Sequence, residues 1–96
     1  PKLRDYELMC IFNPDLEESK VEDIINRLQE IVNNNGGELQ GIDRWGKRRL
    51  AYPIKKFHDG YYIVMNFKGN GALLKELDRI IKLTEESLRH MIIRRD

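Results

Sequence analysis

The residue types that most often carry out catalysis or bind metals are few here: two histidines and one cysteine. His58 lies in a predicted turn and His90 in a predicted strand, and neither has a second His or Cys at ligand spacing. We interpret both as imidazoles on the surface or on a binding face. Cys10 lies in an apolar run without a basic neighbour to lower its pKa, which favours a buried hydrophobic role over a reactive thiol. No metal and no cofactor are predicted.

The neighbouring carboxylates do not form an acid and base pair. They lie on the faces or ends of predicted helices, where solvated side chains and partners for the helix dipole are usual. These residues are Glu17, Glu18, Glu22, Asp23, Glu85 and Glu86. The glycines do not form a phosphate-binding loop that leads into a helix with Lys and Ser or Thr. We therefore predict that the chain is not an enzyme.

A dense basic segment is the strongest candidate for a binding site. Between residues 44 and 56 there are six basic residues and no acidic one: Arg44, Lys47, Arg48, Arg49, Lys55 and Lys56. Trp45 and Tyr52 lie among them. Guanidinium groups bind phosphate and flat rings stack on unpaired bases, so the mixture favours RNA. The alternative is a charged edge strand whose lysines and arginines prevent aggregation, with Trp45 and Tyr52 packed against the domain.

The charge distribution supports a polyanionic partner more strongly than the net charge of +1 does, because the chain outside this segment has 11 basic and 16 acidic residues.

Ninety-six residues predict one domain, residues 1–96, with a core that needs no disulfide. The single cysteine favours a reducing compartment, and no stretch approaches the ~18 apolar residues of a membrane span. We expect a cytoplasmic protein without a membrane partner or a small-molecule substrate.

The apolar period switches between two and about 3.6, and the switches fall at turn residues. The resulting order is β-α-β-β-α-β, which predicts a ferredoxin-like α+β sandwich: a four-stranded antiparallel sheet with two helices on one face. The first helix begins at a cap formed by either Asp15 or Ser19, and Asn70 caps the second. The predicted elements are a strand at 6–12, a helix at 16–35, a strand at 39–51, a turn at 58–60, a strand at 61–67, a helix from about 71 to 81 and a strand at 88–94.

The sheet face without helices is predicted to carry an apolar patch. If Leu8, Cys10 and Phe12 point toward the helices, alternation places a second set of side chains on the open face. That set is Met9, Ile11, Tyr62, Val64 and Ile92, rimmed by Glu7, His90 and Arg94. An RNA-recognition motif would stack bases here on aromatic rings, but alternation provides one ring, Tyr62. The face is therefore predicted to bind protein.

The nine residues from Gly46 to Ile54 closely resemble the signature of the bacterial ribosomal protein numbered six of the small subunit. Residues 4–7, Asn13-Pro14, residues 60–62 and residues 89–94 are similar to that family too, so the resemblance covers essentially the whole chain. It implies a non-catalytic ribosomal protein. Family members pair with small-subunit protein number eighteen, and the pair binds the central domain of the small-subunit ribosomal RNA during platform assembly.

Carried over to this chain, the resemblance implies RNA or partner contacts at Lys47, Arg48, Arg49 and Tyr52, with Arg4 and Lys56 as secondary candidates. The basic residues Arg44, Lys55 and Arg94 complete the set of candidates. Two alternatives belong to other classes. A ferredoxin-like enzyme such as an acylphosphatase needs an arginine-bearing glycine loop after the first strand, and residues 13–15 are not one. A ligand-sensing or protein-binding homodimer of the same fold would use the open sheet face on itself.

Overall fold

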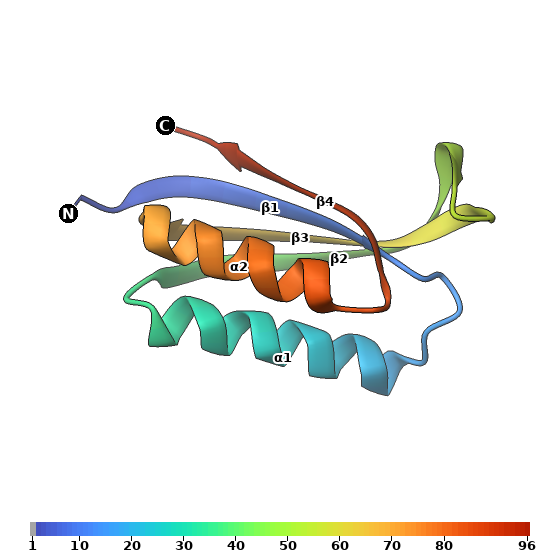
Figure 1. Ribbon diagram of the computed structural model, residues 1–96, viewed down its shortest axis with the longest axis horizontal. Helices are drawn as coiled ribbons and strands as arrows, with labels where there is room; N and C mark the ends of the chain where they lie inside the picture. The colour runs from blue at the N-terminus through green and yellow to red at the C-terminus, as the bar shows by residue number, and fades with distance from the viewer. Residues whose placement is uncertain (1) are drawn as a thin grey trace.

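The computed structural model describes residues 2–96, which form the predicted β-α-β-β-α-β order. The elements are β1 (Arg4–Phe12), α1 (Glu18–Asn34), β2 (Glu38–Ile54), β3 (Phe57–Gly69), α2 (Gly71–Leu83) and β4 (Ser87–Arg94). The four strands form one antiparallel sheet in the order β2-β3-β1-β4. Both helices cover one face of it (Figure 1). The ferredoxin-like fold predicted from the sequence is confirmed.

The core forms where the apolar stripes of both helices meet the inward side chains of β1 and β3. Phe12 and Phe67 are its largest fully buried side chains. Alternation predicts the inward residues of β1 and β3 correctly, because the polar residues Glu7 and Asn66 mark the positions that face away from the helices. Among residues 2–96, neither helix is long and apolar enough to cross a bilayer.

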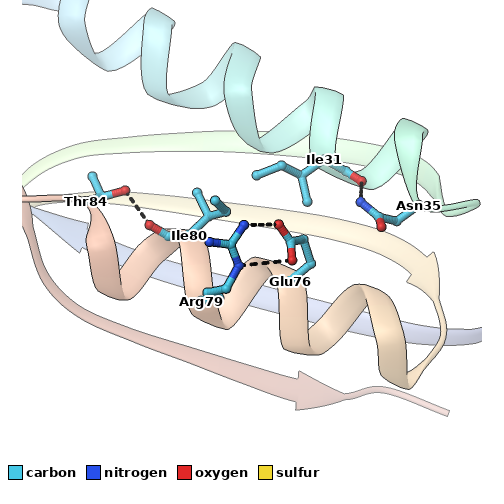
Figure 2. A network of polar contacts seen from close by, with 6 residues as sticks. All are labelled: Ile31, Asn35, Glu76, Arg79, Ile80 and Thr84. Carbon is cyan, nitrogen blue, oxygen red and sulfur yellow. Dashed lines mark hydrogen bonds and ion pairs between the residues drawn. The ribbon is translucent and has the colours of Figure 1, made fainter.

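The helix ends are closed by local hydrogen bonds. Asn70 caps α2 as predicted: its side-chain oxygen accepts from the Leu73 amide at 3.0 Å. At the C-terminal ends, the Asn35 amide donates to the Ile31 carbonyl and the Thr84 hydroxyl donates to the Ile80 carbonyl, each at 2.8 Å (Figure 2). The Thr84 bond supplies a partner to a carbonyl near the end of α2, and the Asn35 side-chain bond adds to the one that the Asn35 backbone N–H already donates to Ile31.

Neither predicted cap of α1 is present, because Glu17 occupies the N-cap position without a side-chain hydrogen bond. Asn13 forms the preceding turn instead, by accepting a hydrogen bond from the Asp15 amide at 2.9 Å. Asp15 is thereby held two residues before the cap, and Ser19 already lies within the helix.

The turn predicted at residues 58–60 is wrong. β2 and β3 are joined by the two residues Lys55 and Lys56, and β3 already begins at Phe57. Both lysines have positive φ, 51° and 86°, the combination of the mirror-image two-residue turn that matches strand twist. Asp59-Gly60 has the composition of a turn but lies within the strand, where Gly60 serves packing.

Candidate RNA and partner interface

The β2–β3 hairpin extends beyond the rest of the sheet and bends at one end of the molecule (Figure 1). Two irregularities in the β2–β3 register accompany this, one between Arg44 and Gly46 and one between Arg49 and Ile54. Gly46 has φ +79°, a conformation that glycine adopts without strain. Bulges bend a strand and increase its twist, so these positions aim the basic segment away from the sheet.

The bent hairpin is packed onto the open sheet face through a small apolar contact. Leu50 of β2 and Ile11 of β1 are both buried, and Gly60 lies between them. A Cβ atom at Gly60 would lie 2.3 Å from the Ile11 Cγ2 atom and 3.3 Å from the Leu50 Cδ2 atom. The absence of a side chain at Gly60 therefore permits this close approach.

Two polar contacts connect the hairpin to β4 across the end of the sheet. The Arg89 guanidinium donates a hydrogen bond to the Tyr52 hydroxyl. The Lys55 Nζ atom lies 3.5 Å from the Ser87 carbonyl oxygen. Tyr52 is thus held against the domain through its hydroxyl while its ring stays exposed.

Six of the nine basic-site candidates gather on this hairpin. They are Lys47, Arg48, Arg49, Tyr52, Lys55 and Lys56, and all six side chains are exposed. Within residues 2–96, no carboxylate lies at ion-pair distance from any of the five cations. The hairpin therefore presents positive charge that the chain itself does not neutralise.

Arg44 has a different environment, although it belongs to the same run in the sequence. Its guanidinium donates two hydrogen bonds to the Glu22 carboxylate of α1, both at 2.8 Å. The bonded guanidinium lowers the pKa of Glu22, and the carboxylate raises that of Arg44. Arg44 thus connects β2 to α1 on the helix side of the sheet.

Arg4 and Arg94 lie at the other end of the sheet from the hairpin, at the start of β1 and the end of β4. The Arg94 Nε atom is 2.7 Å from an Asp96 carboxylate oxygen. The structure therefore does not bring these two candidates together with the basic hairpin.

The predicted partner face is partly wrong, because Ile92 lies on the helix side of the sheet. Directly opposed residues of antiparallel strands share a face, and Ile92 pairs with inward Leu8. Ile92 accordingly packs against the core. Met91 and Ile93 would point inward if Ile92 pointed outward as predicted, but they pair with Met9 and Glu7 on the open face.

The apolar run in β4 explains this error. Met91, Ile92 and Ile93 are all apolar, so the strand has no alternation that fixes its phase. It is simpler to assume that the two side chains of Met91 and Ile93 enter the core, but the β1–β4 register places Ile92 there instead. His90, predicted to face outward, shares the helix side, and its Nε2 atom is 2.6 Å from Asp78 Oδ1 of α2.

Two further members of the predicted patch are covered by the chain itself. Ile11 is 8% exposed beneath the hairpin, and Val64 is 4% exposed on the central strand β3. The apolar side chains that the open face does offer are Met9, Tyr62, Met91 and Ile93, which we call the open-face patch. Met91 is 41% and Ile93 43% exposed. A shallow hollow of ≈170 Å³ lies against Met9, Tyr62 and Met91.

A second aromatic ring lies beside this patch. Trp45 is the extra residue at the β2 irregularity, and its ring stacks on Tyr62 with centroids 6.0 Å apart and planes at 16°. Simple alternation counts one outward aromatic ring and misses Trp45. Gly46, a glycine inside a strand pattern, is the signal in the sequence that could have indicated the bulge.

The single cysteine is accounted for by packing. Burial raises the pKa of the Cys10 thiol to about 12, which confirms its prediction as an inert core residue. Across residues 2–96, no cluster of three His, Cys, Asp or Glu side chains is arranged to hold a metal ion. The features that could serve recognition are therefore the basic hairpin and the open-face patch.

Comparison with known proteins agrees with both the sequence signature and the fold. The family profile described as Ribosomal protein S6 matches residues 5–94. The small ribosomal subunit protein bS6 of Carboxydothermus hydrogenoformans is 49% identical over 94 residues, covering 98% of each chain. That of Dictyoglomus turgidum is 48% identical over 90 residues, covering 94% of this chain and 93% of the relative.

Solved structures show the same likeness. The crystal structure of the 30S ribosomal protein S6 from Thermotoga maritima superposes with a TM-score of 0.91 at 36% identity, covering 98% of this chain and 89% of that one. The C-terminal domain of the MgtC protein from Mycobacterium tuberculosis gives a TM-score of 0.66 at 14% identity, covering 97% of this chain and 88% of that one. This second likeness concerns the fold alone.

Proposed function

Because this chain belongs to the ribosomal protein S6 family of the small ribosomal subunit, we propose that it binds ribosomal RNA through the β2–β3 hairpin and a protein partner through the open-face patch. The RNA is the central domain of the small-subunit ribosomal RNA. The partner is small-subunit protein number eighteen, and the two proteins bind cooperatively during platform assembly. The proposed role is structural.

The observation that carries the RNA part of the proposal is the set of five cations on one hairpin that have no carboxylate partner in the part of the chain that the structure describes. Lysine and arginine that neutralise phosphates release counterions from RNA, and this release supplies much of the affinity. The bent hairpin that carries these cations lies at one end of the molecule, beyond the rest of the sheet. A few charges give weak binding on their own, so a partner that also binds RNA would strengthen it through effective concentration.

The open-face patch supports the protein part of the proposal. Met91 and Ile93 are large apolar side chains left exposed beside Met9 and Tyr62. An apolar patch with a polar rim is typical of a protein contact. The patch and the basic hairpin adjoin on the same face, so a partner seated on the patch would lie beside bound RNA.

The test of the function is binding of a central-domain RNA fragment, with and without protein number eighteen, at two salt concentrations. Tight binding that needs the partner and weakens as salt rises supports the proposal. If no RNA binds under any of these conditions while the chain pairs with itself, the function is that of the homodimer alternative.

The basic hairpin is tested by reversing Lys47, Arg48 and Arg49 together to Glu. RNA binding should be lost while the fold, measured by circular dichroism and thermal unfolding, is retained. The matched control reverses Lys20, Arg27 and Lys75, three exposed cations on the two helices, to Glu. Equal loss in both variants would indicate a general charge effect and contradict a hairpin site.

The partner surface is tested by Met91→Asp and Ile93→Asp, because these side chains are exposed and their replacement leaves the core intact. Each should weaken pairing with the partner by at least about tenfold, the usual effect of truncating an interface anchor. The control is Leu83→Asp, an exposed apolar residue at the end of α2. Normal pairing by both open-face variants would move the partner site elsewhere.

A further inference from the structure

Trp45, the only tryptophan of the chain, lies on the open face because of a backbone irregularity. The register between β2 and β3 passes from Arg44 opposite Ile63 to Gly46 opposite Tyr62, which leaves Trp45 as the extra residue. Gly46 takes the positive φ at this point. Three residues later the chain returns to the same ring, because the Arg48 guanidinium carbon lies 5.2 Å from the Trp45 ring centroid.

The Trp45 ring is itself fixed by its stacking on Tyr62. Tyr62 belongs to the central strand β3, opposite Ile11 of β1, so it is part of the rigid sheet. Trp45 thereby connects a rigid surface to the guanidinium of Arg48. A guanidinium near an aromatic face is attracted by the ring quadrupole and held in a restricted set of positions.

The two arginines Arg44 and Arg48 show what this arrangement leaves available. Arg44 forms an ion pair with Glu22 and donates two hydrogen bonds to its carboxylate. Arg48 is held by a ring, which neither neutralises its charge nor accepts its N–H groups in the plane. Within residues 2–96 it forms no ion pair and no side-chain hydrogen bond, so its planar set of donors remains free for an oxyanion.

We propose that Trp45 is a positioning residue, which holds the Arg48 guanidinium as a preformed site for a phosphate of the RNA backbone. This inference rests on the proposed function and deepens it: of Lys47, Arg48 and Arg49, the cation that residues 2–96 hold against a ring before RNA arrives is Arg48. Preorganisation reduces the ordering cost of binding, so the contribution of Arg48 depends on the ring beneath it. Lys47 and Arg49 contribute as charges that the RNA orders on binding.

A double-mutant cycle tests this dependence. Affinity of the isolated protein for the central-domain RNA fragment is measured at low salt, for Trp45→Leu, Arg48→Gln and the double variant. Each single variant should lose about tenfold, the size of one charge-assisted contact, and the double variant should lose no more than Arg48→Gln alone. Trp45→Phe, which keeps an aromatic face, should retain most of the affinity.

The matched comparison repeats the double-mutant cycle with Arg49 in place of Arg48. Trp45→Leu combined with Arg49→Gln should show losses that multiply, because Arg49 is not on the ring. If Trp45→Leu leaves the RNA affinity unchanged, or if its loss of affinity multiplies with that of Arg48→Gln, the positioning role is refuted while the hairpin site stands. If the unaltered protein binds no RNA with or without its partner, the proposed function fails first.

A second measurement does not require any change to Trp45. Because the chain has no other tryptophan, the emission of the unaltered protein reports this site directly. RNA that engages Arg48 above the ring should change the Trp45 emission on titration, and Arg48→Gln should abolish that change while Arg49→Gln preserves it. Unchanged emission at saturating RNA would overturn the inference even if Trp45→Leu fails to fold.

Discussion

Gly60 is the residue on which the close packing of the hairpin against β1 depends. Because a Cβ atom there would meet the branched Ile11 side chain at 2.3 Å, Gly60→Ala should cost about 1–3 kcal/mol, as overpacking of a rigid contact does. The free energy of unfolding from urea titration measures this cost. Gly41→Ala is the control, since the same atom on this β2 glycine meets nothing within 4 Å. Equal effects of the two changes would contradict a specific steric role for Gly60.

Lys55 and Lys56 form the hairpin turn in a conformation that residues with a Cβ atom adopt at a cost. Lys56→Gly, at φ 86°, should raise the free energy of unfolding by about 0.5–1 kcal/mol, because relief of this strain exceeds the entropy lost by glycine. Lys56→Ala removes the same charge but keeps the strained φ, so it should not stabilise. Both should weaken RNA binding equally, and a stability gain in Lys56→Ala would disprove the strain.

The elements that sequence reasoning located correctly are those with one clear period. In β1 and β3 the polar residues Glu7 and Asn66 mark the outward positions, and α1 and α2 each have an apolar stripe, so their inward faces follow from spacing. The face of each β4 residue could not be assigned in this way, because the polar residues beside its apolar run lie on both faces: Arg89 faces outward and His90 faces the helices. The hairpin turn was also out of reach, since Asp59-Gly60 has turn chemistry and Lys55-Lys56 has none.

The phase of β4 predicts opposite outcomes for two adjacent isoleucines. Ile92 packs on the core, so Ile92→Ala should lower the free energy of unfolding by about 2 kcal/mol, whereas Ile93→Ala on the open face should cost less than about 1 kcal/mol. Chemical denaturation of the two variants makes the comparison with identical chemistry at both sites. A larger loss at Ile93 would restore the phase expected from the sequence alone.

The contact between α1 and β2 predicts a dependence on pH. Glu22 has a folded pKa below its ordinary value of 4.5 because Arg44 donates to its carboxylate. A lowered carboxyl pKa adds stability above the unfolded value, and that stability is lost as pH falls through the folded pKa. Unfolding free energies measured between pH 3 and 7 should therefore fall less steeply toward low pH in Glu22→Gln.

Two further variants test whether the pH dependence comes from the Glu22–Arg44 pair. In Arg44→Gln, as in Glu22→Gln, the free energy of unfolding should fall less steeply toward low pH, since either change removes the same pair. Asp78, whose pKa is lowered by hydrogen bonds from Lys82 and His90, keeps part of the slope in both variants. Glu30→Gln, which removes one exposed carboxylate from the same helix, is the matched control for the charge change. An unaltered slope in both Glu22→Gln and Arg44→Gln would show that the pair adds no stability.

At the scale of the whole molecule, the order of elements was sufficient to predict the fold but not the site. The nine candidate contact residues are separated in space by the antiparallel topology, which places Arg4 and Arg94 at the end opposite the hairpin. The bend of the hairpin, which covers Ile11 and brings Tyr52 to Arg89 of β4, depends on register irregularities. Contacts between such distant segments have no local signal in the sequence.

The resulting separation of charge predicts the salt dependence of RNA binding. If the five hairpin cations each neutralise one phosphate, the logarithm of affinity should fall with the logarithm of salt concentration with a slope of about −4. Reversing Lys47, Arg48 and Arg49 leaves two lysines, so any residual binding should have a slope weaker than about −2. Reversal of Lys20, Arg27 and Lys75 changes the net charge equally but lies on the helices, so the slope should stay near that of the unaltered protein. If the slope is weakened equally in both variants, RNA binding depends on the net charge of the whole molecule, and the hairpin has no special role.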